Sequence, residues 1–410
     1  NIKFTVIISL IVALGGFLLG FDSAVISGAL PYYSETFGLE HGSWLLGFSV
    51  SVLILGAILG NIVAGKLADQ YGRRKILMAT AILFAFSAIT SALAIDIISF
   101  LIARVIGGFG VGMAILVAPM YIAEVSPRKL RGRLVSFNQL NIVVGISIAF
   151  FSNLFIQQAI AEPDLKWRIM LGVEAIPAFL YFLLLYTVPQ SPRWLMQKGR
   201  FEEATAVLSK IHGTQQALVE FKEISDSLNE EKVVEKAKWS EVFSARMKTV
   251  LIIGFGIAFF QQITGINAIF YYAPMIFEMA GGAQDTAFLQ AAMLGVTNVV
   301  MTVVAMFLID SLGRKPLLYI GATGIFLSLT IVGFSFVKAT YTVDEKSMTV
   351  IVNEVSAMED GLTHAVNIQK LEELKDRVFE NEVEFFNKVE EKIGAVSYNL
   401  HRDTDRKSVV

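Results

Sequence analysis

The 410-residue sequence contains no cysteine, which excludes disulfides, zinc–thiolate sites and thiol nucleophiles. Charged residues are scarce at 17%, and 34 basic residues nearly balance 36 acidic ones. A nucleic-acid partner would require a basic surface, so none is expected. The four histidines, His41, His212, His364 and His401, have no metal-ligand spacing and are expected at the surface. The sequence also has neither a Gly-x-x-x-x-Gly-Lys-Ser/Thr loop for ATP nor a Ser, His and Asp arrangement, so we expect no enzyme and no cofactor.

Apolar residues make up 54% of the chain, more than a water-soluble protein of this length can bury. They gather in runs of about twenty residues, the length at which a helix crosses a hydrocarbon core of roughly 30 Å. The predicted fold class is therefore all-α, a polytopic membrane helical bundle in contact with a lipid bilayer. We expect nine spans, at about 4 to 30, 45 to 68, 76 to 94, 97 to 122, 134 to 157, 168 to 188, 248 to 277, 286 to 309 and 316 to 337.

The positions of Lys and Arg predict the orientation of the bundle. The short connections after the second, fourth and eighth spans carry basic residues, whereas those after the first, third and seventh carry none. Basic connections stay on the cytoplasmic side, so we expect a cytoplasmic amino terminus in a plasma (inner) membrane. The first apolar run leads into a second, which favours a true span over a cleaved signal peptide.

Four segments follow from this topology: an amino-terminal six-helix bundle at 1–189, a cytoplasmic helical linker at 190–246, spans seven to nine at 247–337, and an extracytoplasmic soluble helical loop at 338–410. Phe201, Ala204, Leu208 and Ile211 have the spacing of an amphipathic helix, so the linker is either a rigid lid or a solvated connector. Helix formers and charges at 367–393 predict soluble helices there. Because the second half has only three spans, we expect a piece of a longer protein that does not transport alone.

An internal repeat connects the two halves of the chain. The pattern Asp-x-x-Gly-Arg-basic occurs after the second span and again after the eighth, about 240 residues later. A glycine permits a tight turn there, and the Asp and Arg can form ion pairs that hold the cytoplasmic face closed. The alternative is that these residues only orient the protein. The repeated residues are Asp69, Gly72, Arg73 and Arg74, and Asp310, Gly313, Arg314 and Lys315.

Several further motifs, together with this repeat, resemble those of a known family. They are Arg104-Val105-Ile106-Gly107-Gly108; Pro119-Met120-Tyr121-Ile122-Ala123-Glu124 with Arg131-Gly132; Pro189-Gln190-Ser191-Pro192-Arg193; and Gln261-Gln262-Ile263-Thr264-Gly265-Ile266-Asn267 with Tyr271-Tyr272. In this order they resemble the sugar porter branch of the major facilitator superfamily over residues 10 to 337. The resemblance implies a cytoplasmic gate made of Asp69, Arg73, Arg74, Glu124, Arg131, Arg193, Asp310 and Arg314. Gln190 departs from the family's Pro-Glu-Ser-Pro-Arg form, which weakens one charge contact of that gate.

Amides within the spans point to a sugar ligand. Asn and Gln side chains both donate and accept hydrogen bonds, as sugar hydroxyls do, so several amides can replace the water around a sugar. The alternative is that they only join helices to one another. On one continuous helix, much of the set in span seven shares a face. The resemblance assigns sugar contacts to Gln139, Gln261, Gln262, Asn267, Tyr271 and Asn298.

Two charges lie inside the amino-terminal spans, Asp22 in the first and Arg104 in the fourth. Such charges are costly unless they are paired or functional. In proton-driven members of the family, a carboxylate and an arginine at these positions couple proton movement to sugar movement, whereas the alternative is a static ion pair. We therefore expect proton-coupled import of a hexose or pentose by alternating access. A facilitative uniporter for a sugar or polyol and a transporter-like nutrient sensor are the alternatives.

Overall fold

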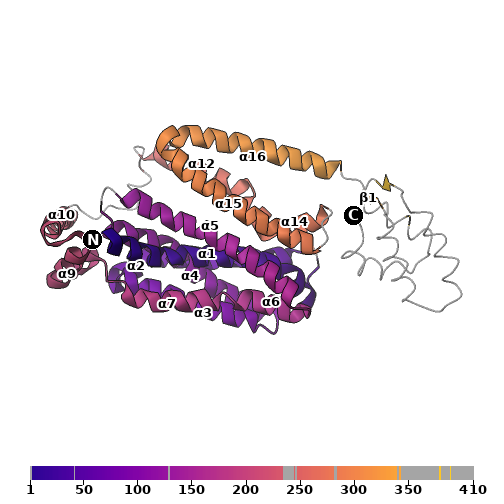
Figure 1. Cartoon of the computed structure of the whole chain (residues 1–410), viewed down its shortest axis with the longest axis horizontal. Coiled ribbons are helices and arrows are strands. Elements are labelled where there is room, and N and C mark those ends of the chain that lie inside the picture. The colour runs from indigo at the N-terminus through magenta and orange to yellow at the C-terminus, as the bar shows by residue number, and fades with distance from the viewer. Residues whose placement is uncertain are drawn as a thin grey trace. The chain divides into compact units, whose positions relative to one another are not determined.

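The computed structural model describes residues 2–40, 42–127, 130–233, 244, 247–280, 284–338, 341–342, 378–379 and 388. They divide into two compact units, one of Asn1–Ala273 with Phe288–Phe307 and one of Pro274–Ala287 with Leu308–Val410. Within the described residues, nine helical segments are long and apolar enough to cross a membrane. The predicted all-helical bundle is thereby confirmed, and Figure 1 shows the helices from α1 to α7 packed as one layered bundle.

The six amino-terminal spans are all present. Five are single helices: α1 (Ile2–Thr36), α2 (Trp44–Tyr71), α3 (Arg73–Ala92), α4 (Ile97–Val125) and α5 (Arg131–Ala159). The sixth begins at Pro163 and consists of α6 (Pro163–Gly172), α7 (Ala175–Leu184) and the short 3-10 helix η1 (Leu185–Thr187). Side chains fix two of the helix starts, because Ser43 caps α2 and Asp96 forms a capping box with Ser99 at α4.

Small residues bring two pairs of spans into close contact. A Cβ atom at Gly108 or Gly112 of α4 would overlap the carbonyl oxygens of Leu53 or Ala57 in α2. Helix α1 approaches α5 in the same manner at Gly20. Van der Waals packing between small residues holds membrane helices together because lipid provides no hydrophobic force between them. These contacts give the amino-terminal half a tightly packed interior in which a buried charge can be held.

Three helices occupy the described part of the 190–246 segment: α8 (Pro192–Gln197), α9 (Phe201–His212) and α10 (Thr214–Val233). Ala204, Leu208 and Ile211 are buried, as their spacing predicts. Phe201 is 53% exposed, so the expectation that it belongs to the same buried face is wrong. As the first residue of α9 it lies at the edge of this small core, and its ring meets that of Phe221 edge-on at 6.1 Å.

The remaining spans include one broken helix. The predicted continuous seventh span is divided into α12 (Lys248–Ile263), α13 (Ile266–Tyr271) and α14 (Ala273–Met279). The first break falls at Gly265, which has a left-handed backbone with φ of 77°. Spans eight and nine are α15 (Gln284–Leu312) and α16 (Arg314–Val337). A glycine readily adopts the left-handed conformation, so Gly265 breaks the seventh span at a defined residue.

Two short strands lie in the segment predicted to be a helical loop. Strand β1 (Tyr341–Thr342) pairs antiparallel with β2 (Val378–Phe379), with Tyr341 opposite Phe379. The prediction of a helix through 367–393 is therefore wrong at residues 378 and 379, where β-branched and aromatic side chains suit an extended pair. Lys388 is helical, and the rest of that prediction lies outside the described residues.

Candidate functional site

A buried ion pair lies within the amino-terminal bundle. Arg104 Nη1 of α4 donates a hydrogen bond to Asp22 Oδ1 of α1, and the two side chains are 3% and 2% exposed. Removing two charges from water is costly, and a close partner offsets much of that cost. The structure thus brings together the two charges that the sequence analysis singled out within the spans.

A third charged side chain, which the sequence analysis missed, joins this pair. Glu174 lies between α6 and α7, is 3% exposed, and lies close enough to Asp22 and Arg104 to interact electrostatically with both. Two carboxyl groups can share a hydrogen bond only if one of them carries a proton. Asp22 Oδ2 and Glu174 Oε1 are buried and have no hydrogen-bond partner among the described residues. The signal was available, since Glu174 is a carboxylate within an apolar run, as Asp22 is.

The three groups together form what we call the charge cluster: Asp22, Arg104 and Glu174. It contains two carboxyl groups and one guanidinium group, so one bound proton leaves it electrically neutral. With both carboxyl groups ionised, the cluster would carry one uncompensated negative charge among buried side chains, which is unfavourable. Binding or loss of a proton in this cluster would therefore change its charge balance.

The predicted amides of span seven meet at the break in that helix. Asn267 Nδ2 donates to Gln262 Oε1 at 3.0 Å, across the turn at Gly265. The shared face does not come from one continuous helix, as we expected, because the left-handed residue redirects the chain between the two amides. The side chains of Gln261, Gln262 and Asn267 are exposed and can therefore reach a ligand. Discontinuous helices of this kind commonly form the substrate sites of transporters.

Tyr271 links this region to the charge cluster. Its hydroxyl group lies close to the side chain of Ser23, the residue that follows Asp22 in α1. Of the other predicted sugar contacts, Gln139 of α5 is exposed and Asn298 of α15 is half-buried. The structure thus joins Gln262 with Asn267 and Tyr271 with Ser23, while Gln139, Gln261 and Asn298 remain separate polar side chains on their helices.

The predicted gate residues form an ion-pair cluster at the end of α2. Arg73 Nη2 lies 2.9 Å from Glu124 Oε1 of α4, and Arg73 Nη1 lies 3.1 Å from Asp69 Oδ1. The same guanidinium donates to the carbonyl oxygen of Ala68 at 3.0 Å. Gly72, with φ of 91°, makes the turn that places Arg73 there. Gln190 lies beside this glycine, so a neutral amide occupies the position where the family pattern has a carboxylate.

Arg74 is directed elsewhere. Its Nε and Nη2 atoms donate to the carbonyl oxygens of Leu185 and Tyr186, both at 2.9 Å. It therefore caps the end of the sixth span and does not join the Arg73 cluster. Consecutive helical residues point about 100° apart, which explains the different partners.

Arg131 and Arg193 line a hollow of about 300 Å³ together with Glu124. Arg193 Nη1 also lies 3.5 Å from Ser227 Oγ of α10. His212 lines the same hollow and is partly buried, so its predicted surface position is wrong. The end of α9 packs against the bundle there. His41, His364 and His401 lie outside the described residues.

The second copy of the repeat belongs to the other unit. Gly313 separates α15 from α16 with φ of 81°, as Gly72 separates α2 from α3. Arg314 begins α16 and is exposed, while the side chain of Asp310 lies outside the described residues. The two copies of the motif therefore share their local backbone geometry, a helix, a glycine with positive φ and a second helix.

Residues 8–355 match the family model described as "Sugar (and other) transporter". The chain belongs to the sugar transporter family. It is 40% identical to the arabinose-proton symporter of Bacillus subtilis (strain 168), over 82% of this chain and 72% of the relative. It is 38% identical to the D-xylose-proton symporter of Escherichia coli (strain K12), over 82% and 73%.

The solved structures agree with these relatives. The partially occluded inward-open conformation of the xylose transporter from E. coli superposes with a TM-score of 0.73 at 36% identity, covering 82% of this chain and 80% of that one. The predicted sugar porter membership and major facilitator fold are thereby confirmed. The protein is an integral membrane transporter and not an enzyme.

Proposed function

We propose that the protein imports a monosaccharide, a pentose or a hexose, together with protons by alternating access. The observation that carries the proposal is the buried charge cluster, in which Asp22 lies close to both Arg104 and Glu174. The relatives named above, an arabinose-proton and a xylose-proton symporter, also support proton-coupled transport of a monosaccharide.

The cluster supplies a route from proton binding to movement of the bundle. Deprotonated Asp22 attracts Arg104 strongly, because the surrounding helices exclude water. Protonation weakens that attraction and leaves the guanidinium free to take another partner. If two arrangements of α1 and α4 bind the proton with different affinity, protonation changes their relative free energies. The size of the change is set by the difference in proton affinity between the two arrangements.

The sugar enters this scheme through span seven. We assign hydroxyl contacts to Gln139, Gln261, Gln262, Asn267, Tyr271 and Asn298, where amide and phenol groups replace hydration. The position of Tyr271 close to Ser23 gives sugar binding a direct connection to α1 beside Asp22. A sugar that draws Tyr271 away from Ser23 would change the packing around the charge cluster. No cofactor is needed for this cycle, since the proton gradient supplies the energy.

The gate, topology and division of the chain complete the proposal. Asp69, Arg73 and Glu124 hold the face that carries the basic connections closed. Arg131 and Arg193 act beside Glu124, Arg74 holds the end of the sixth span, and Asp310 and Arg314 have the gating role of the second copy of the motif in the other unit. That face is cytoplasmic, the amino terminus lies on the same side, and the membrane is the plasma membrane. Residues 190–246 form the cytoplasmic linker between the bundles at 1–189 and 247–337, and 338–410 is an outer loop.

The test reconstitutes the purified protein into proteoliposomes and measures uptake of labelled arabinose, xylose and glucose with and without an inward proton gradient. We expect accumulation above the external concentration only with the gradient, together with alkalinisation of the outer medium. Equal equilibration with and without the gradient would favour facilitated diffusion. Sugar binding without any counterflow would favour a sensor.

A further inference from the structure

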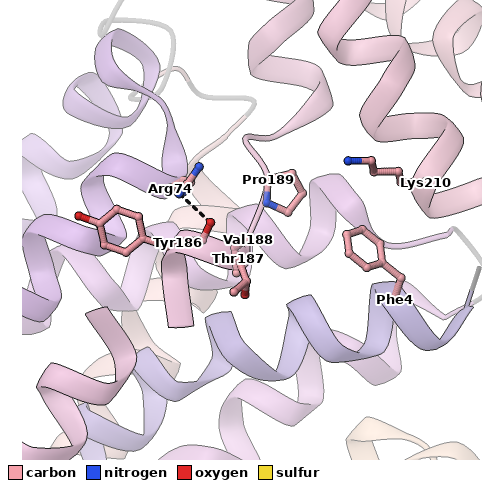
Figure 2. Close-up of a pocket in the computed structure, with 7 residues that line it drawn as sticks. All are labelled: Phe4, Arg74, Tyr186, Thr187, Val188, Pro189 and Lys210. Carbon is pink, nitrogen blue, oxygen red and sulfur yellow. Dashed lines mark hydrogen bonds between the residues drawn. The ribbon is translucent and has the colours of Figure 1, made fainter. Parts of the chain in front are cut away.

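A hollow of about 450 Å³ opens at the junction of four segments of the first unit. Its lining comes from the start of α1, the start of α3, the end of the sixth span and the last turns of α9. Figure 2 shows Arg74 and Tyr186 on one side of it and Lys210 with Phe4 on the other, with Pro189 between them. The hollow therefore lies where three membrane spans end and the linker begins.

The charge on this lining is entirely positive. Arg74 and Lys210 contribute two cations, and the described residues that line the hollow include no acidic side chain. Arg74 donates hydrogen bonds to the carbonyl oxygens of Leu185 and Tyr186, which use two of its five N–H donors. Lys210 is exposed and has no ion-pair partner among the described residues. Two cations lining one recess without an acid attract an anion.

Apolar surface continues from the hollow along the spans. Tyr186 is exposed, and Leu183 and Phe179, three and seven residues before it, are exposed on the same side of the sixth span. Phe4 lines the hollow, and Ile7, one turn further into α1, is also exposed. A cationic recess next to an exposed apolar stripe matches a molecule with an anionic head and a hydrocarbon tail.

We propose that this hollow binds the phosphate headgroup of an anionic phospholipid, held by Arg74 and Lys210, with an acyl chain along Tyr186, Leu183 and Phe179. The shared chemistry is a phosphate group, which a soluble phosphate could also supply. The apolar stripe favours the lipid. A bound headgroup would fasten α9 of the linker to the ends of the first, third and sixth spans, and so stabilise the linker against the bundle.

The test measures binding to the purified full chain in a neutral detergent. Short-chain phosphatidylglycerol is titrated while the thermal unfolding midpoint is followed, with phosphatidylcholine and inorganic phosphate in parallel titrations. The variant is Lys210→Gln, because Arg74 also caps the sixth span and its loss could disturb folding. The matched control is Lys75→Gln, which removes an exposed lysine beside Arg74 that does not line the hollow. Lys210→Arg keeps the charge and serves as the rescue.

We expect phosphatidylglycerol, and not phosphatidylcholine, to raise the midpoint of the unaltered protein. Lys210→Gln should weaken that binding about fivefold, the equivalent of about 1 kcal/mol for one lysine near an anionic headgroup. Lys75→Gln should change it less than about twofold, and Lys210→Arg should restore it. Equal weakening by both glutamine variants, or no weakening by either, would overturn the proposal. Stabilisation by inorganic phosphate alone that depends on Lys210 would overturn the lipid assignment.

Discussion

Asp22 and Arg104 are separated by 82 positions in the sequence, yet they form a buried ion pair between α1 and α4. Gly107 of α4 lies beside this pair, since a Cβ atom there would lie 3.9 Å from Asp22 Oδ2. Glu174 adds a second carboxyl group beside Asp22. The pair is therefore part of a group of charges whose balance depends on one proton.

Replacing Asp22 with Asn should abolish proton-driven accumulation while leaving sugar exchange intact. Asparagine keeps the size of the side chain and removes the group that takes up the proton. Uptake and counterflow in proteoliposomes separate the two activities. Asp96→Asn is the control, because that carboxylate caps α4 outside the membrane spans. Undiminished uphill uptake by the Asp22 variant would refute the coupling role.

The amides at the broken helix can be tested by their effect on affinity. Gln261→Ala or Asn267→Ala removes a partner for sugar hydroxyls, and each lost hydrogen bond costs roughly 0.5 to 1.5 kcal/mol. Sugar affinity should therefore fall about three- to tenfold in calorimetry or transport inhibition. Thr330→Ala is a suitable control, because Thr330 is a half-buried polar residue on α16 whose hydroxyl is bonded within its own helix. Unchanged affinity in both amide variants would remove them from the sugar site.

Gly265→Ala tests the break itself. An alanine in the left-handed conformation costs about 1 to 2 kcal/mol, so the variant should unfold at lower denaturant concentration. Gly254 lies in the middle of α12 with free space around it, and Gly254→Ala should be neutral or stabilising by about 0.5 to 1 kcal/mol. If the two variants had equal stability, Gly265 would not require its observed backbone.

The Arg73 to Glu124 contact predicts non-additive losses of stability. Their side chains are 5% and 10% exposed, and removing one partner of a buried pair costs about 3 to 5 kcal/mol because the other charge remains. Arg73→Gln and Glu124→Gln should each destabilise more than half as much as the double variant. A double-mutant cycle from denaturant unfolding measures this coupling. Strict additivity would show that the two residues act independently.

His212 predicts a pH effect on the linker. Partial burial lowers the pKa of His212 below its ordinary value of 6.5, and nearby Glu220 opposes this by a smaller amount. The unfolded chain then binds more protons, so stability is full above about pH 6.5 and decreases as the pH falls through the lowered pKa. His212→Gln should flatten this dependence in thermal unfolding between about pH 5 and 7.5. An unaltered pH profile in that variant would contradict the assignment.

The spans could be predicted because each is a local property of the sequence. A helix in lipid satisfies its own backbone groups, so a run of apolar residues of sufficient length determines both the helix and its place. The repeated Asp-x-x-Gly-Arg motif was equally local, and Gly72 and Gly313 both have positive φ. The broken seventh span was missed because the length and apolarity of residues 248–277 suggest one helix, although Gly265 marked a position where it could end.

The charge cluster shows where sequence reasoning ends. Asp22 and Arg104 stood out as costly charges, and Glu174 gave the same signal, but nothing in the sequence states which helix faces meet. The separate partners of Arg73 and Arg74 also depend on which neighbour each helix face meets. The sequence by itself determined the membrane class, the spans and the chemical types of the site. Only the tertiary structure decided that Asp22 has two partners, because contacts between spans depend on how helix faces pack and not on hydropathy.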